Sequence, residues 1–143
     1  MMRDILFRGK SVETGEWEYG DLVHFRGSKL IYIHTTYGEA EIYREVEPDT
    51  VGQYTEQKDL NGNKIFEGDI LMRCNDREDL LCIWWNDETS AFCAVDDDCM
   101  YEADIINSLE LFDNRYDSPE LLDVRNPKDD DEGNDWLAFI QEE

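Results

Sequence analysis

The sequence feature that most limits the fold of this chain is an Asn-Gly pair at positions 61 and 62. It lies in the stretch 53–72, between two runs that can form strands. Asn and Gly both tolerate the positive φ that a tight type I′ turn requires, so the pair predicts a hairpin of that type. A second turn, at residues 67–69, leads into an apolar run at 70–72. The stretch therefore predicts the centre of a mostly β protein.

The amino-terminal third alternates short apolar runs with turn residues. The runs of strand length lie at residues 5–7, 17–19, 22–25, 30–33 and 41–46. Gly20 and Asp21 are expected to interrupt the second and third runs, and residues 26–29 have the length of a hairpin loop. We therefore expect residues 1–52 to form a small antiparallel meander.

Three further apolar runs follow the Asn-Gly pair, at residues 70–72, 80–85 and 91–95. A four-residue loop at 86–89 would place Trp84 opposite Ala91 and Cys82 opposite Cys93. Residues 104–112 fit either a short helix or a strand, and we expect a strand that ends at Phe112. These runs predict a second unit over residues 53–125, with an SH3-like barrel over 53–112.

The last part of the chain changes in composition. Residues 126–134 contain four consecutive acids and no apolar side chain, which is typical of a solvated linker. A short C-terminal helix is expected after it, with one apolar face. The region 126–143 thus reads as an acidic linker and an apolar tail that packs on its own chain, swaps onto a second copy or binds a partner.

The excess of acids limits the partners of the protein. Its 36 Asp and Glu residues against 13 Lys and Arg give a formal net charge of −23 and a sequence pI near 4.1. Such a surface repels the phosphates of nucleic acid and anionic membranes, and it attracts basic groups. We expect no direct nucleic-acid binding and no membrane binding. The apolar share of 41%, with 12% aromatic residues, still predicts a folded chain.

The compartment of the protein determines whether its four cysteines are reduced thiols or disulfides. No apolar segment has the length of a signal region or a membrane span, so we expect a cytoplasmic protein with reduced thiols. Cys74, Cys82, Cys93 and Cys99 include no Cys-x-x-Cys pair of the kind found in zinc ribbons. We expect Cys82 and Cys93 to lie in the core without a redox role, because no activating base is adjacent.

Three carboxylates near the Asn-Gly pair make the best case for an enzyme. If Asp59, Glu67 and Asp69 converged, they would hold Mg²⁺ or act as acid and base. The chain is poor in the cationic groups that hold a phosphate substrate, and turn formation explains Asp69 better, because it also accounts for Gly68. His24 and His34 are expected on neighbouring strands but not opposite each other. The sequence therefore predicts no cofactor, no metal and no catalytic residue.

A set of short motifs runs in order along most of the chain. They are Gln53-Tyr54-Thr55, Lys58-Asp59, Asn61-Gly62, Lys64-Ile65 and Glu67-Gly68-Asp69-Ile70, preceded by Phe7-Arg8-Gly9-Lys10, Thr14-Gly15-Glu16-Trp17 and Gly20-Asp21-Leu22 and followed by Tyr116, Pro119, Glu120, Leu121 and Leu122. In this order they resemble the YopX family of phage and prophage proteins. The resemblance implies a β-rich fold and a mobile-element origin, and it implies no reaction.

Two positions depart from the family pattern. Glu56 stands where the family usually has glycine, and Asp113 with Arg115 stands where a glycine and an apolar residue are usual. If those glycines adopt positive φ, the turns of this chain are expected to be strained or reshaped.

Taken together, the sequence predicts a non-enzymatic, phage-derived interaction protein with a protein partner or with self-association as a possible homo-oligomer. The sharper hypothesis is an acidic decoy for a basic site on a host nucleic-acid enzyme, because dense carboxylates approximate the spacing of duplex phosphates. The alternatives are an accessory or oligomeric protein with a merely solubilising surface, and a divalent-metal-dependent enzyme using the three carboxylates. The residues expected to bind the partner are Asp96, Asp97, Asp98, Asp129, Asp130, Asp131, Trp136, Leu137, Phe139 and Ile140.

Overall fold

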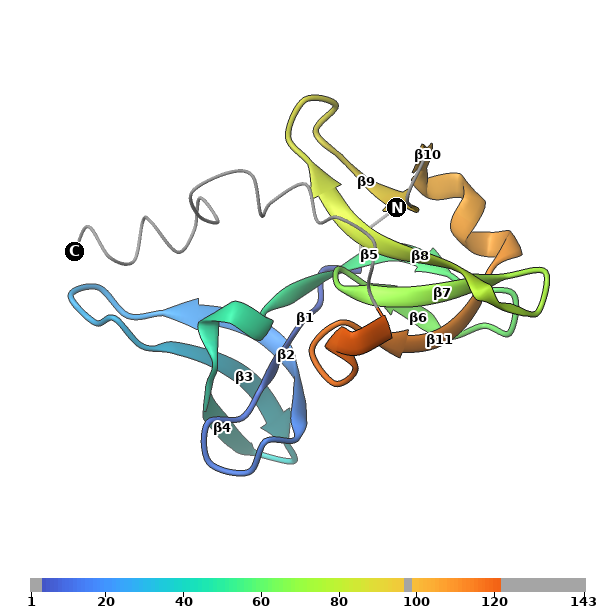
Figure 1. The fold of residues 1–143 in the computed structure, drawn as a ribbon. Helices are drawn as coiled ribbons and strands as arrows, with labels where there is room; N and C mark the ends of the chain where they lie inside the picture. The colour runs from blue at the N-terminus through green and yellow to red at the C-terminus, as the bar shows by residue number, and fades with distance from the viewer. Residues whose placement is uncertain (1–3, 97–98, 122–143) are drawn as a thin grey trace. The chain divides into compact units, whose positions relative to one another are not determined.

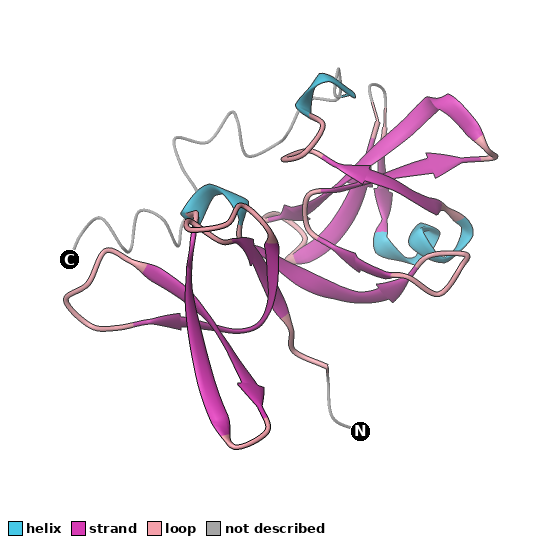
Figure 2. Cartoon of the chain, turned by 90° about the horizontal axis from the view of Figure 1, so that it is seen from below, coloured by secondary structure: helices cyan, strands magenta, loops and turns pink. Residues whose placement is uncertain are grey.

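The computed structural model describes residues 4–96 and 99–121, and the chain divides into two units between Gln53 and Tyr54. The described residues form antiparallel strands joined by turns and short 3-10 helices (Figures 1 and 2). The mostly β class is confirmed. The last helical element described, η3 (Pro119–Leu121), is a 3-10 turn, and the expected C-terminal helix falls outside the described residues. No helix of the described residues is long and apolar enough to cross a membrane.

The first unit is a meander of antiparallel strands. They are β1 (Phe7–Lys10), β2 (Trp17–His24), β3 (Ile31–Tyr37) and β4 (Ala40–Val46), followed by the 3-10 turn η1 (Pro48–Thr50) and the first residues of β5 (Gly52–Lys58), which return to pair with β1. Ile31, Ile33 and Val46 form its buried centre. Strand alternation places these residues on one face, so the opposite face of β2, β3 and β4 carries the other half of their side chains.

Strand β2 differs from the prediction, because Gly20 and Asp21 do not interrupt it. Gly20 pairs with Phe7, and Asp21 pairs with His34. A Cβ atom at position 20 would lie 2.1 Å from the carbonyl oxygen of His34. Glycine here permits the close approach of two strands, which composition alone does not distinguish from a turn.

The described residues of the second unit form the Asn-Gly hairpin and a five-stranded sheet. The rest of β5 pairs with β6 (Lys64–Phe66), and the sheet has the order β10-β9-β8-β7-β11. Its strands are β7 (Asp69–Arg73), β8 (Asp76–Asn86), β9 (Ala91–Val95), β10 (Met100–Glu102) and β11 (Glu110–Asn114). Its core is formed by Ile65, Leu71, Leu81, Ile83, Ala94, Ile106 and Leu109. Because β10 and β11 are the two edges of this sheet, the SH3-like barrel is not confirmed.

The segment 104–112 contains both structures that its sequence pattern fits. The 3-10 helix η2 (Ala103–Ser108) comes first and buries Ile106. Strand β11 then runs to Asn114, two residues beyond the predicted end at Phe112.

The hairpin of β8 and β9 has a register that differs by two residues from the prediction. Trp84 lies opposite Cys93, and Cys82 lies opposite Val95. The loop covers residues 87–90 instead of 86–89, and Ser90 adopts a φ of +53° in it. A shift of two residues preserves the faces of a strand, so Cys82 and Cys93 still share one buried cluster with Trp84 and Val95.

The Asn-Gly hairpin is present, but its turn is not of type I′. Gly62 has a φ of +85°, whereas Asn61 is not among the residues with positive φ. The amide of Gly62 donates to the carbonyl of Asp59 at 3.1 Å, so the turn begins at Asp59. Within β5, Glu56 adopts a φ of +69° at an irregularity in the β5–β6 pairing, so the backbone is strained at this departure from the family pattern, whereas Asp113 and Arg115 are not among the residues with positive φ.

Candidate partner-binding site

The side chain of Asp59 is buried and serves the fold through hydrogen bonds. It is 5% exposed, and its Oδ1 atom accepts the amides of Asn61 at 2.9 Å and Asn63 at 2.8 Å. Its Oδ2 atom accepts the amide of Leu111 at 2.8 Å and the side-chain amide of Asn63 at 3.1 Å. Burial alone would raise the pKa of Asp59, but these hydrogen bonds outweigh burial and lower it. The carboxylate therefore shapes the hairpin turn and joins it to β11.

The turn at residues 67–69 also uses its acid for the backbone. Asp69 is 2% exposed, and its Oδ2 atom accepts the amide of Phe66 at 2.7 Å. Gly68, with a φ of +92°, donates its amide to the carbonyl of Ile83 at 2.7 Å and accepts the amide of Arg115 at 2.9 Å. In the described part of the chain, no three His, Cys, Asp or Glu side chains are placed to hold a metal ion. The enzymatic use of Asp59, Glu67 and Asp69 stays a prediction.

The two histidines lie on neighbouring strands at different registers, as expected. His24 lies opposite Ile31, and its Nε2 atom contacts the carbonyl of Ser28. The Nδ1 atom of His34 lies 3.4 Å from Asp21, and its Nε2 atom lies 3.6 Å from Glu41. Each histidine thus has its own partners.

The two cysteines of β8 and β9 are unsuited to nucleophilic chemistry. Cys82 is 0% exposed and Cys93 is 4% exposed, and burial raises the pKa of both thiols. Both therefore stay protonated near neutral pH. Cys74 and Cys99 are exposed free thiols.

Among the acids expected to bind a partner, Asp96 can be placed. Its Oδ2 atom lies 3.1 Å from Nη2 of Arg73, which also pairs with Asp79 through Nε at 2.8 Å. Its Oδ1 atom accepts the amide of Cys99 at 2.7 Å. Asp96 therefore closes a turn and an ion-pair network. The other nine expected binding residues lie outside the described residues: Asp97, Asp98, Asp129, Asp130, Asp131, Trp136, Leu137, Phe139 and Ile140.

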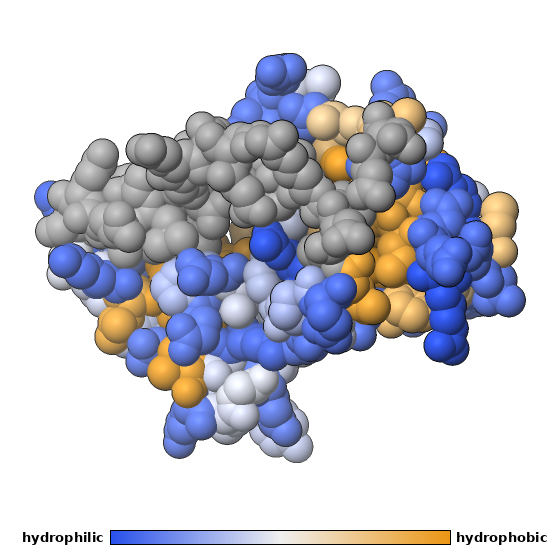
Figure 3. Space-filling view, in the orientation of Figure 1, coloured by the Kyte–Doolittle hydropathy of each residue, from blue (hydrophilic) through white to orange (hydrophobic). Residues whose placement is uncertain are grey.

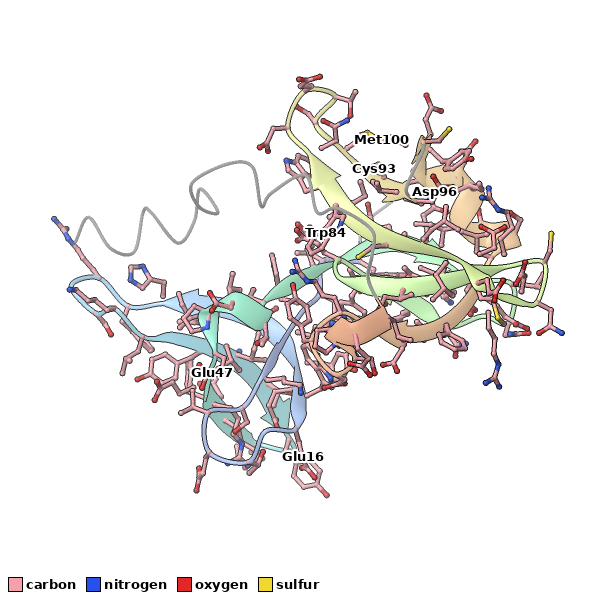
Figure 4. The ribbon with its side chains drawn as sticks, in the orientation of Figure 1. Glu16, Glu47, Trp84, Cys93, Asp96 and Met100 are labelled. Atoms are coloured by element: carbon pink, nitrogen blue, oxygen red, sulfur yellow. The ribbon has the colours of Figure 1, made fainter. Side chains whose placement is uncertain are left out.

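A groove of about 540 Å³ lies at the end of the hairpin of β8 and β9, beside β10 and the start of η2. Phe92, Cys93, Met100 and Tyr101 give it an apolar lining, and Asn86 closes one side through a 3.0 Å contact with the sulfur of Met100. Figure 4 labels Cys93 and Met100 on these strands, with Asp96 just after β9. The volume is in the range of sites that take a small molecule or a few side chains.

The acids Glu102 and Asp104 complete the lining of this groove, and both are exposed. Sequence reasoning missed the site, because β10 has three residues and begins two positions after an acidic run. The only signal was the pair Met100-Tyr101, which is too short for a periodicity.

The acids are unevenly distributed along the sequence. Residues 54–143 contain 26 of the 36 acids and 7 of the 13 bases. Residues 1–53 contain the other 10 acids and 6 bases. Hydrophilic residues cover much of the face shown in Figure 3, with smaller apolar areas between them. The negative charge is therefore mainly a property of the sequence after residue 53.

Comparison with known proteins gives one family and one fold. The model of the YopX protein family matches residues 6–123. Protein EF1440 from Enterococcus faecalis, known from a crystal structure, is 22% identical with a TM-score of 0.53, over 84% of this chain and 99% of that chain. This likeness supports the fold alone. No match was found among curated proteins.

Proposed function

The chain belongs to the YopX protein family, and from that premise we propose that it is a non-enzymatic interaction protein that binds a basic protein partner. The observation that carries the proposal is the excess of 26 acids over 7 bases after residue 53. Such an excess attracts basic surfaces across a screening length of about 10 Å at 0.1 M salt.

The groove of the second unit supplies an apolar contact beside these charges. Met100 is 50% exposed there, and the acids Glu102 and Asp104 stand next to it. Protein interfaces combine a buried apolar anchor with a polar rim. A basic segment with one large apolar side chain therefore fits this groove.

In its sharper form, the proposal is that the chain is a phage-derived decoy that acts in the cytoplasm on a host enzyme of nucleic acid. Exposed carboxylates on the sheet and on its connecting segments would take the place of duplex phosphates in the basic site of that enzyme. We assign this role to exposed acids of the second unit, which are Asp76, Glu78, Asp87, Glu88, Glu102 and Asp104.

The test is a competition with DNA. The immobilised full chain is incubated with a bacterial lysate at about 50 mM NaCl, and a retained protein is purified and measured alone at about 50 and about 300 mM NaCl. We expect a nucleic-acid enzyme that duplex DNA displaces and whose binding falls at least about ten-fold at the higher salt. Retention that neither salt nor DNA affects would overturn the decoy.

Matched variants separate a binding surface from a merely solubilising one. Asp96 is left unchanged, because it pairs with Arg73. Neutralising three acids of the second unit should weaken the complex several-fold more than neutralising three exposed acids of the first unit. The test variant is Glu88→Gln/Asp97→Asn/Asp98→Asn, and the control is Glu13→Gln/Glu16→Gln/Glu39→Gln. Equal effects of the two variants would favour the solubilising role.

A further inference from the structure

The outer face of the sheet in the first unit carries a row of aromatic side chains. By the register of the strands, Tyr32 lies between Val23 on β2 and Glu45 on β4, and His34 lies between Asp21 and Tyr43. These residues alternate with Ile31 and Ile33, which are buried in the core of the unit. The row therefore lies on the side of the sheet opposite to that core.

The rings of this row touch one another. Phe25, which follows β2, lies 5.5 Å from Tyr32 and 5.8 Å from Tyr43 between ring centroids. The rings of His34 and Tyr43 are 4.7 Å apart. Phe25 is 49% exposed and Tyr43 is 46% exposed. We call Phe25, Tyr32, His34 and Tyr43 the aromatic row. It exposes apolar ring surface to solvent. The many charged residues already keep the chain soluble, so solubility does not explain this exposed surface.

Acids accompany the aromatic row on the same face. The register places Asp21, Glu41 and Glu45 there, whereas Arg44 lies opposite the buried Ile33 and so belongs to the other face. The carboxylates of Asp21 and Glu41 flank His34, and their side chains are 73% and 66% exposed. Among the described residues, no lysine or arginine lies over the rings of Phe25, Tyr32 or Tyr43.

Ring faces and carboxylates attract the same chemical group. The face of an aromatic ring is negative and holds a cation within about 6 Å of its centroid. A guanidinium stacks flat on such a ring while its edge donates to carboxylates, which the compact ammonium of lysine does less well. The chain itself contains the contact of guanidinium and ring: Arg8 lies 4.4 Å from the ring centroid of Trp17, and Arg115 lies 4.5 Å from that of Trp84.

We propose that the aromatic row is a docking site for an arginine side chain of an extended, basic segment of a partner protein. The guanidinium stacks on Tyr43 and Phe25 and pairs with Glu41 or Glu45. Charge complementarity selects this occupant, because three carboxylates on the face oppose the phosphates of a single-stranded nucleic acid. The site lies wholly in the first unit, so it does not depend on the acids after residue 53.

The experiment uses the full chain and two capped peptides, hexa-arginine and hexa-lysine, with backbone amide chemical shifts as the readout. Because the second unit attracts both peptides by charge alone, binding is scored only from shifts of β2, β3 and β4. We expect saturable shifts in these strands, with hexa-arginine binding about five-fold more tightly than hexa-lysine.

Substitutions test the ring directly. Tyr43→Ala should weaken hexa-arginine binding at these strands by about five-fold, and Tyr43→Phe, which keeps the ring, should bind like the natural chain. Tyr37→Ala is the control, since Tyr37 is 80% exposed and lies outside the aromatic row. The same spectra show whether each variant is folded. If Tyr43→Ala loses its fold, Glu41→Gln/Glu45→Gln replaces it, with the same expected direction.

Several results would overturn the proposal. Equal binding of the two peptides at β2–β4, or shifts confined to the second unit, would leave only general attraction by charge. Tighter binding of an oligothymidine than of hexa-arginine on this face would assign it to nucleic acid. Self-association that Tyr43→Ala abolishes would assign it to a second copy of the chain. None of these outcomes would touch the proposal for the second unit, whose acidic variants are measured separately.

Discussion

At the scale of single residues, Asp59 shows how an acid can resemble a catalytic group and yet serve the fold. Its carboxylate accepts three main-chain amides, from Asn61, Asn63 and Leu111. Two of these donors belong to the Asn-Gly turn and the third to β11, so one side chain holds together segments about fifty positions apart in the sequence. Removal of its charge should therefore affect the stability of the whole unit.

We predict that Asp59→Asn lowers the free energy of unfolding by about 2–3 kcal/mol, because buried amides lose a charged acceptor. The pKa of Asp59 is lowered in the folded protein, so its contribution is present above the ordinary carboxyl pKa of about 4 and is lost as the pH falls through the folded pKa. Urea denaturation of both proteins between about pH 7 and about pH 3 should show the difference between them shrinking on the acid side.

The control for this prediction is Asp87→Asn, at an exposed acid in the loop between β8 and β9. It should change the free energy of unfolding by less than about 0.5 kcal/mol at any pH in the range. A constant difference between Asp59→Asn and the natural chain down to about pH 3 would contradict the role of the ionised carboxylate.

At the scale of elements, Gly68 fixes how the turn before β7 packs on the end of β11. Its φ of +92° is strained for any other residue, and an added Cβ would lie 2.6 Å from the ring of Tyr116. Gly68→Ala should therefore lower the free energy of unfolding by about 2–4 kcal/mol, which combines backbone strain with overpacking.

Gly62→Ala separates backbone strain from overpacking, because Gly62 has a similar φ of +85° but no atom within 4 Å of an added Cβ. It should cost only about 1–2 kcal/mol. In a double-mutant cycle, Tyr116→Ala should relieve part of the effect of Gly68→Ala, as measured by urea denaturation. Additive effects of the two substitutions would show that the ring and the turn do not oppose each other.

The elements also show how far the sequence predicts this structure. Apolar alternation located most strands, and turn residues located the Asn-Gly hairpin, because both signals are local. Register was missed where a loop moved by one position, since Ser90 takes the positive φ that lets the β8–β9 loop begin at Asp87. The predicted SH3-like barrel was not confirmed, because closure of a sheet depends on contacts between its edge strands, which local patterns do not contain. The groove was missed because Met100 and Tyr101 form a strand only by pairing with β9.

The candidate sites follow the same rule. The sequence predicted that Asp69 serves a turn, and the amide of Phe66 confirms this, but it did not reveal that Asp59 also accepts the amide of Leu111, because that donor lies 52 positions away in the sequence. The aromatic row was likewise invisible, since Phe25, Tyr32 and Tyr43 lie on separate runs that only the register brings onto one face. The excess of acids, in contrast, does not depend on which residues the fold brings together, so it could be counted from the composition.

At the scale of the whole molecule, the net charge of −23 has two consequences of opposite sign. Like charges repel one another more strongly in the compact state, so screening should stabilise the fold. Unlike charges attract across an interface, so the same screening should weaken a complex with a basic partner. Salt therefore distinguishes a charge that acts within the chain from one that acts between chains.

We predict that the Tm of the protein alone rises by several degrees when NaCl increases from about 10 to about 300 mM, as the screening length falls from about 30 Å to below 10 Å. Differential scanning calorimetry measures this rise, and Glu88→Gln/Asp97→Asn/Asp98→Asn should show a smaller one. A Tm that falls with salt would mean that attractive pairs, such as Arg73 with Asp79 and Asp96, outweigh the general repulsion. The acids after residue 53 would then be used in ion pairs within the fold. That result would remove the physical basis for a surface that binds a basic partner.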